Sequence, residues 1–149
     1  MKKCFAMFVM VGLVSGLSMN AFAYKQLNDK FLEFYGSPET KDTSDEFKTL
    51  AKETKCNVCH ILGETKKKHN PFGTALHAEI KAAKLPVKEL VVDLKKDTKS
   101  TKYDDALKAI FKKVVEQKAG TTDKTFAERM KAGELPGGDK EGKGLPAAK

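Results

Sequence analysis

The chain has 149 residues and a formal net charge of +8, with 28 lysine and arginine residues against 20 aspartate and glutamate residues. This length suits one domain with a modest core. Arg129 is the only arginine, and lysine suits the steering of acidic partners better than the reading of bases or the clamping of phosphates. With no aromatic-basic reader motif, this composition argues against a nucleic-acid-binding protein.

Residues 1–23 have the layout of a secretory signal peptide. A lysine pair precedes an apolar run over residues 5–17, and the segment ends in Ala-Phe-Ala at Ala23. The apolar run is too short for a stable membrane span, which favours a cleaved signal over an uncleaved anchor. We expect the mature chain to begin at Tyr24, to lack a membrane span, and to be exported to the periplasm or an equivalent compartment outside the cytosol.

Residues 24–42 are predicted to form an N-terminal helix and a linker. Leu27, Phe31 and Phe34 recur at the spacing of one helix face, and Gly36 is placed to stop the helix. This apolar stripe could serve a partner subunit, but we expect it to fold back on its own domain.

The next helix is predicted to open the main domain, which spans residues 43–136. Thr43 and Glu46 have the spacing of a capping box, and the helix that they open runs into Cys56. Its apolar face is formed by Phe47, Leu50 and Ala51.

Two further helices are predicted after a turn at Asn70 and Pro71, because proline restricts the residue before it. The second of them is expected to have Pro86 at its first position. The apolar positions of the two helices are Leu76, Ile80, Ala83, Val87, Leu90, Val91 and Leu94.

The C-terminal part is predicted to hold the longest helix, opened by a capping box at Thr101 and Asp104 and closed by Gly120. A short helix over about 123–133 follows. Residues 137–149 contain mainly Gly, Pro, Lys, Glu and Ala, a composition typical of a flexible, disordered tail. No strand alternation is present, so the predicted fold class is all-α.

The sequence Cys56-Asn-Val-Cys59-His60 is the attachment signature of c-type haem. The two thiols can add across the two vinyl groups of a haem, and the histidine can then supply the proximal ligand of the iron. Cys4 falls within the signal segment, so Cys56 and Cys59 are the only cysteines of the mature chain. Export agrees with haem attachment, which takes place outside the reducing cytosol.

Two cysteines and a histidine at this spacing could also serve three other purposes. A disulfide-exchange motif normally follows a strand in a βαβ unit, and none is predicted here. A zinc site could use Cys56, Cys59 and two of the histidines His60, His69 and His77, but adjacent ligands close a tetrahedral site poorly. A structural disulfide between such close residues gives little stabilisation. We therefore favour one covalently bound haem c.

The chain resembles the class I c-type cytochromes, in particular short secreted members with one haem. The motifs that carry the resemblance are Cys56–His60, Asn70–Gly73 in the pattern N-x-[FY]-G, and Phe126–Pro136 in the pattern F-x-x-R-x-x-x-G-x-L-P. The similarity covers about residues 43–136, and the haem motif is its most specific part.

This resemblance implies a class I cytochrome c-like helical domain built around the haem. It also implies that Asn70, Pro71 and Phe72 contribute to the cofactor site. In the family, a carbonyl of the proline loop orients the proximal histidine, which here would be His60.

The distal ligand is where this chain departs from the family, which usually places a methionine between the haem motif and the last helix. No methionine lies between Tyr24 and Met130. Met130 and His77 are therefore the candidates for the distal ligand, with His69 a weaker one. A lysine, or an open five-coordinate iron, is the remaining possibility.

These features predict an exported monohaem cytochrome that carries single electrons and is not an enzyme. Its expected partners are acidic redox proteins, with a second cytochrome subunit as another. The alternative is a haem module that binds NO or CO at an open or weakly ligated distal site.

Overall fold

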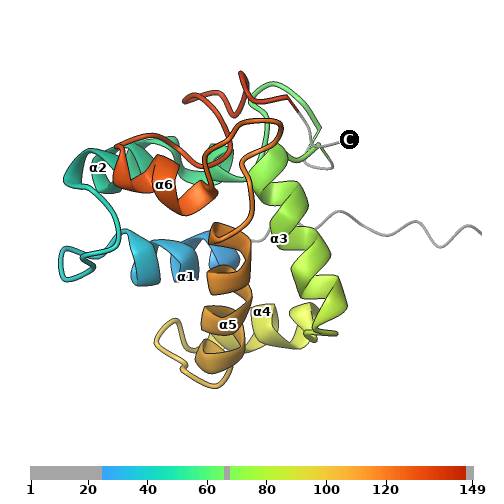
Figure 1. Ribbon diagram of the computed structural model, residues 1–149. Coiled ribbons are helices and arrows are strands. Elements are labelled where there is room, and N and C mark those ends of the chain that lie inside the picture. Colours follow the sequence, from blue (N-terminus) through green and yellow to red (C-terminus); the bar gives the residue numbers. More distant parts are fainter. Residues whose placement is uncertain (1–24, 66–67, 147–149) are drawn as a thin grey trace, which may run out of the picture.

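The computed structural model describes residues 25–65 and 68–146, and this part of the chain contains helices and no strand. The described residues form the α-helices α1 to α6, which follow one another in chain order (Figure 1). Their bounds are α1 (Lys25–Tyr35), α2 (Asp45–Thr54), α3 (Pro71–Ala82), α4 (Val87–Lys96), α5 (Asp104–Val115) and α6 (Phe126–Lys131). A short 3-10 helix (Lys55–Val58) continues α2. The predicted all-α class is confirmed.

The core is an aromatic cluster to which five helices each contribute one phenylalanine. Phe31 of α1 is central, with its ring centroid 5.1 Å from that of Phe72 in α3 and 5.4 Å from that of Phe111 in α5. Phe47 of α2 and Phe126 of α6 complete the cluster, and all five side chains are buried. Each such side chain stabilises the fold by about 1.5–3 kcal/mol relative to exposure. The apolar stripe of the first helix therefore folds back on its own domain.

The start of α2 lies one residue beyond the prediction. Ser44, not Thr43, is the N-cap, and its hydroxyl accepts a hydrogen bond from the backbone N–H of Phe47. The hydroxyl of Thr43 instead donates to the carbonyl of Tyr35 at 2.7 Å, which ties the end of α1 to the start of α2. Both residues can cap a helix, and the contact with α1 decides between them.

The predicted bounds of α5 and α6 also need correction. Thr101 does not cap α5, which begins at Asp104 without a side-chain cap and ends at Val115, before Gly120. The capping box lies instead at Thr125 and Glu128, where it opens α6. The reciprocal bonds between these two residues satisfy two N–H groups that the helix itself cannot pair.

A buried ion pair joins α1 to α5. The Nζ of Lys30, 3% exposed, lies 2.8 Å from Oδ1 of Asp104 and 3.0 Å from Oε2 of Glu33. Burial alone would lower the pKa of Lys30, but hydrogen bonds and charge from the two carboxylates outweigh it and raise this pKa. The pair therefore holds α1 in one position against the domain at neutral pH.

In the described part of the chain, no helix combines the length and the apolar character that spanning a membrane requires. The predicted signal peptide lies outside the described residues.

The prediction of a loose C-terminal tail is wrong for residues 137–146. Arg129 of α6 anchors the preceding turn by donating from Nε and Nη2 to the carbonyl of Leu135. Beyond this turn, the backbone N–H of Leu62 donates to the carbonyl of Glu141 at 2.7 Å, and Nδ2 of Asn57 donates to the carbonyl of Lys140. The segment thus lies against the loop that carries the Cys-x-x-Cys-His motif.

Glycine explains how this segment packs without apolar side chains. Gly137, Gly138 and Gly142 are buried. A Cβ atom added at Gly137 would overlap the side chain of Asn70, and one added at Gly142 would overlap the carbonyl of His60. Backbone at such close range gains hydrogen bonds instead of apolar burial. Residues 147–149 lie outside the described part.

We expect a chain that ends at Pro136 to be less stable than the full mature chain by about 2–4 kcal/mol, because it loses several hydrogen bonds worth about 1 kcal/mol each. A chain that ends at Pro146 is the matched control, because it keeps every hydrogen bond described for this segment. Equal unfolding midpoints for all three proteins would contradict the packing described for this segment.

Candidate functional site

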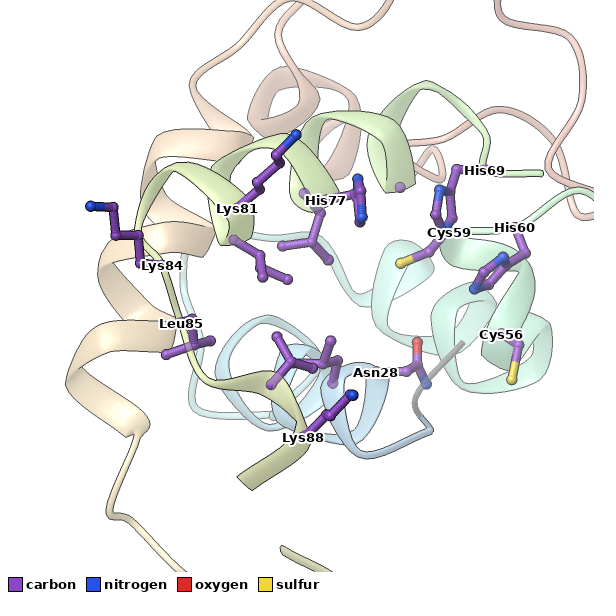
Figure 2. A pocket seen from close by; sticks show the side chains of 15 residues that line it. Asn28, Cys56, Cys59, His60, His69, His77, Lys81, Lys84, Leu85 and Lys88 are labelled. Atoms are coloured by element: carbon purple, nitrogen blue, oxygen red, sulfur yellow. The ribbon is translucent and has the colours of Figure 1, made fainter. Parts of the chain in front are cut away.

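A cavity of about 360 Å³ lies between α1, the Cys-x-x-Cys-His loop, α3 and the start of α4 (Figure 2). This volume is in the range of small-molecule sites, about 300–1,000 Å³. Its apolar walls are formed by Leu27, Leu76, Ile80, Leu85 and Val87. Its polar lining consists of Asn28, Cys56, Cys59, His60, His69, His77, Lys81, Lys84 and Lys88.

The composition of this lining points to an apolar ligand with an anionic part. Both cysteines of the predicted mature chain and all three histidines of the chain line the same cavity. Three lysines line it as well, whereas none of its lining residues is an aspartate or a glutamate. Such a site would bind an apolar body and favour negative charge at its rim.

One tight turn positions the two thiols and the imidazole. The backbone N–H groups of Cys59 and His60 both donate to the carbonyl of Cys56, at 3.2 and 3.1 Å. Lys55, with a φ of +52°, turns the chain sharply from α2 into this segment. Figure 2 shows the sulfur of Cys59 pointing into the cavity, with Cys56 and His60 at the same end.

The two thiols differ in their surroundings. Cys56 is exposed, whereas Cys59 is partly buried, and neither forms a disulfide. Burial, and secondarily the charge of Cys56, raises the pKa of the Cys59 thiol to about 12. A thiol that stays protonated at neutral pH is a poor nucleophile for disulfide exchange. The exposed Cys56 is therefore the more accessible of the two thiols.

Asn70 holds this loop in place from behind. Its fully buried side chain donates from Nδ2 to the carbonyls of Asn57 and Val58, at 3.1 and 2.9 Å. Its Oδ1 accepts from the N–H of Gly73, which caps α3. One amide thus fixes the start of α3 to the segment that carries the cysteines.

The predicted cofactor residues Asn70, Pro71 and Phe72 do not line the cavity. Pro71 occupies the first turn of α3, and Phe72 belongs to the aromatic core. Gly73 lines it instead, and a Cβ atom at this position would overlap the carbonyl of Cys59. Of the predicted Asn-Pro-Phe-Gly motif, Gly73 therefore forms part of the surface of the site, and the other three residues support it.

The three histidines form a row of rings along one side of the cavity. The centroid of His69 lies 4.8 Å from that of His60 and 5.6 Å from that of His77. Burial, followed by the neighbouring His60 and His77, lowers the pKa of His69 to about 4. Its imidazole is therefore neutral at physiological pH.

The two predicted distal ligands lie in different places. His77, on α3, lines the cavity, whereas Met130, on α6, is buried in the core and does not line it. The carbonyl of Met130 accepts a hydrogen bond from Ser44, which fixes α6 against the start of α2. Asn28 was not predicted as a site residue, and it reaches the cavity because α1 packs beside the loop.

No group of three or more His, Cys, Asp or Glu residues in the described ranges could hold a metal ion by itself. The tetrahedral zinc site considered from the sequence is thus not formed by these residues. Comparisons with models of protein families, with curated proteins and with solved structures found no match. The structure by itself defines the class, an all-helical domain with a cavity lined by thiols and imidazoles.

We expect Asn70→Asp to lower the free energy of unfolding by about 3 kcal/mol. The substitution keeps the shape and the cap on α3, but it removes two donors and places a carboxylate against two buried carbonyls. Asn57→Asp is the matched control, because the Asn57 side chain makes an exposed bond, and it should cost less than about 1 kcal/mol. Equal losses in urea unfolding would contradict the role given to Asn70.

Proposed function

We propose that the cavity holds one haem c and that the protein is an exported one-electron carrier, similar to class I c-type cytochromes. Cys56 and Cys59 would hold the haem through thioethers, and His60 would ligate its iron. One observation carries the proposal: both cysteines of the motif and every histidine of the chain line a single apolar cavity. When bound, the haem supplies a ferrous–ferric couple.

The residues present fit this group. Thiols, imidazoles and an apolar wall are the surroundings that a covalently bound haem requires. Each thiol would form its thioether by adding across a vinyl double bond. The S–H bond breaks, a C–S bond forms, and the hydrogen goes to the other vinyl carbon, so no oxidant is needed.

The chain's own residues supply the framework for electron transfer. Leu27, Leu76 and Ile80 form walls that keep water from the apolar body of the ligand. Asn70 and Gly73 fix the loop that presents His60. Surroundings that are held by packing and by buried hydrogen bonds change little between two oxidation states. These features favour a carrier over an enzyme, with acidic redox proteins as its partners.

The position of Met130 favours a second candidate function. With this methionine buried outside the cavity, no methionine lines the site. His77 is then the proposed distal ligand, and if it does not ligate, the iron is open to NO or CO. The second candidate is therefore a haem module that binds small gases.

We expect the mature protein to carry a covalent haem when it is made in a host able to attach it. The variant with both Cys56→Ala and Cys59→Ala should carry none, because no thiol remains to form a thioether. Intact-protein mass spectrometry measures the adduct, and His77→Ala, which should keep it, is the control. A colourless wild-type protein, or an adduct on the double variant, would contradict the proposal.

We expect His77→Ala to change the spectrum of the reduced protein and to increase the shift caused by CO. Met130→Leu, which conserves volume, should change neither and should cost less than about 1.5 kcal/mol of stability. A spectral change with Met130→Leu alone would show that α6 moves to ligate the iron. A large CO shift in the wild-type protein would favour the gas-binding candidate.

A further inference from the structure

The rim of the cavity carries three lysines, of which Lys81 and Lys84 lie at the end away from the cysteines and Lys88 lies along one side (Figure 2). Lys81 lies in the last turn of α3, Lys84 follows that helix, and Lys88 lies in the first turn of α4. All three side chains are exposed. Among the described residues, Lys81 and Lys84 form no ion pair, in contrast to lysines such as Lys25, which pairs with Asp29 at 2.7 Å.

The end of α3 shapes this rim. The N–H of Leu85 donates to the carbonyl of Ile80 at 3.2 Å, and Lys84 between them has a φ of +52°. This is a Schellman-type end, in which the left-handed position usually belongs to glycine. The turn folds Leu85 back towards Ile80 in the cavity wall, and it places a lysine where glycine would fit with less strain.

The two ends of the cavity thus differ in chemistry (Figure 2). Cys56, Cys59 and His60 lie at one end, and Lys81 and Lys84 lie beyond the other. A haem has the matching asymmetry, because its two vinyl groups lie on one half of the macrocycle and its two propionate carboxylates on the other. With its vinyl groups at the cysteines, its propionates would face the lysines.

We propose that Lys81, Lys84 and Lys88 form a carboxylate-binding rim that holds the haem propionates. This inference rests on the proposed function, since it takes haem as the ligand. The lysines fix which way round the macrocycle enters the cavity, so that its vinyl groups meet the two thiols. They also keep both propionates ionised by charge-assisted hydrogen bonds.

The test measures the reduction potential of the holoprotein against pH, because a propionate that takes up a proton changes the potential. The rim variant combines Lys81→Gln, Lys84→Gly and Lys88→Gln. The control variant, with the same change of net charge, combines Lys95→Gln, Lys112→Gln and Lys113→Gln, which are exposed lysines outside the cavity. The other titratable groups of the lining are unchanged in both, namely Cys56, Cys59, His60, His69 and His77.

We expect the acid dissociation constant of the propionates to fall at least about tenfold in the rim variant. The step in the plot of reduction potential against pH should therefore move to higher pH. The control variant should titrate like the wild-type protein. If the rim variant fails to fold, Lys84→Gly alone serves, because glycine adopts the backbone of this position without strain. It should shift the step in the same direction, by less.

Failure of this inference is distinct from failure of the proposed function. If the wild-type protein attaches no haem, the proposed function falls. If haem is attached and the rim variant titrates like the wild-type protein, only the carboxylate-binding rim is overturned. Slower electron transfer with an acidic partner protein, at an unchanged propionate titration, would show instead that the lysines serve docking.

Discussion

The buried amide of Asn70 is the contact on which the rest of the site depends. It caps α3 by accepting from the N–H of Gly73, and it donates to the carbonyls of two residues in the Cys-x-x-Cys segment. One side chain thus connects the start of α3 to the segment that carries the cysteines. The C-terminal segment also packs on it, because Gly137 leaves room for the amide and no other residue would. A polar group that is fully buried and fully bonded specifies one arrangement more strictly than apolar packing does. It is this arrangement that brings the motif to the wall of a cavity.

A fixed position of the Cys-x-x-Cys-His segment matters for function because its thiols and imidazole form part of the lining of the cavity. Thiols and an imidazole gather at one end, apolar walls follow, and exposed lysines line the rim. A ligand with reactive unsaturated groups at one end, a flat apolar body and carboxylates at the other end would match these three zones of the cavity in the same order. A zinc ion would use only the first zone, and a thiol redox reaction would need neither the apolar walls nor the cationic rim. The apolar walls and the lysines are observations, beyond the motif itself, that support the proposal of a haem.

The sequence was informative where the deciding interactions are local. Apolar spacing predicted the helices, and Cys56, Cys59 and His60 were chosen from five adjacent residues that do share one cavity end. It failed where a distant contact decides. Thr43 has the spacing of an N-cap, yet its hydroxyl donates a hydrogen bond to the carbonyl of Tyr35 instead. The C-terminal segment has little apolar area, so hydrophobicity predicted disorder, whereas close backbone approach at Gly142 orders it. The position of Met130 depends on which part of the domain α6 packs against. The apolar periodicity of a single helix shows which face is buried but not what covers that face.

That packing also limits what the distal side of the iron could be. Phe126 and Met130 are both used in the core, and the carbonyl of Met130 ties α6 to Ser44, so moving this methionine to the cavity would empty part of the core. Loss of a buried methionine from its site costs about 2–5 kcal/mol. His77 already lines the cavity, so its ligation would leave the core intact, but the His69 ring that lies between His60 and His77 would have to move aside. If the proposed haem is bound, the choice for its distal side is therefore between an imidazole, which gives a lower potential than methionine does, and an open position that admits a gas.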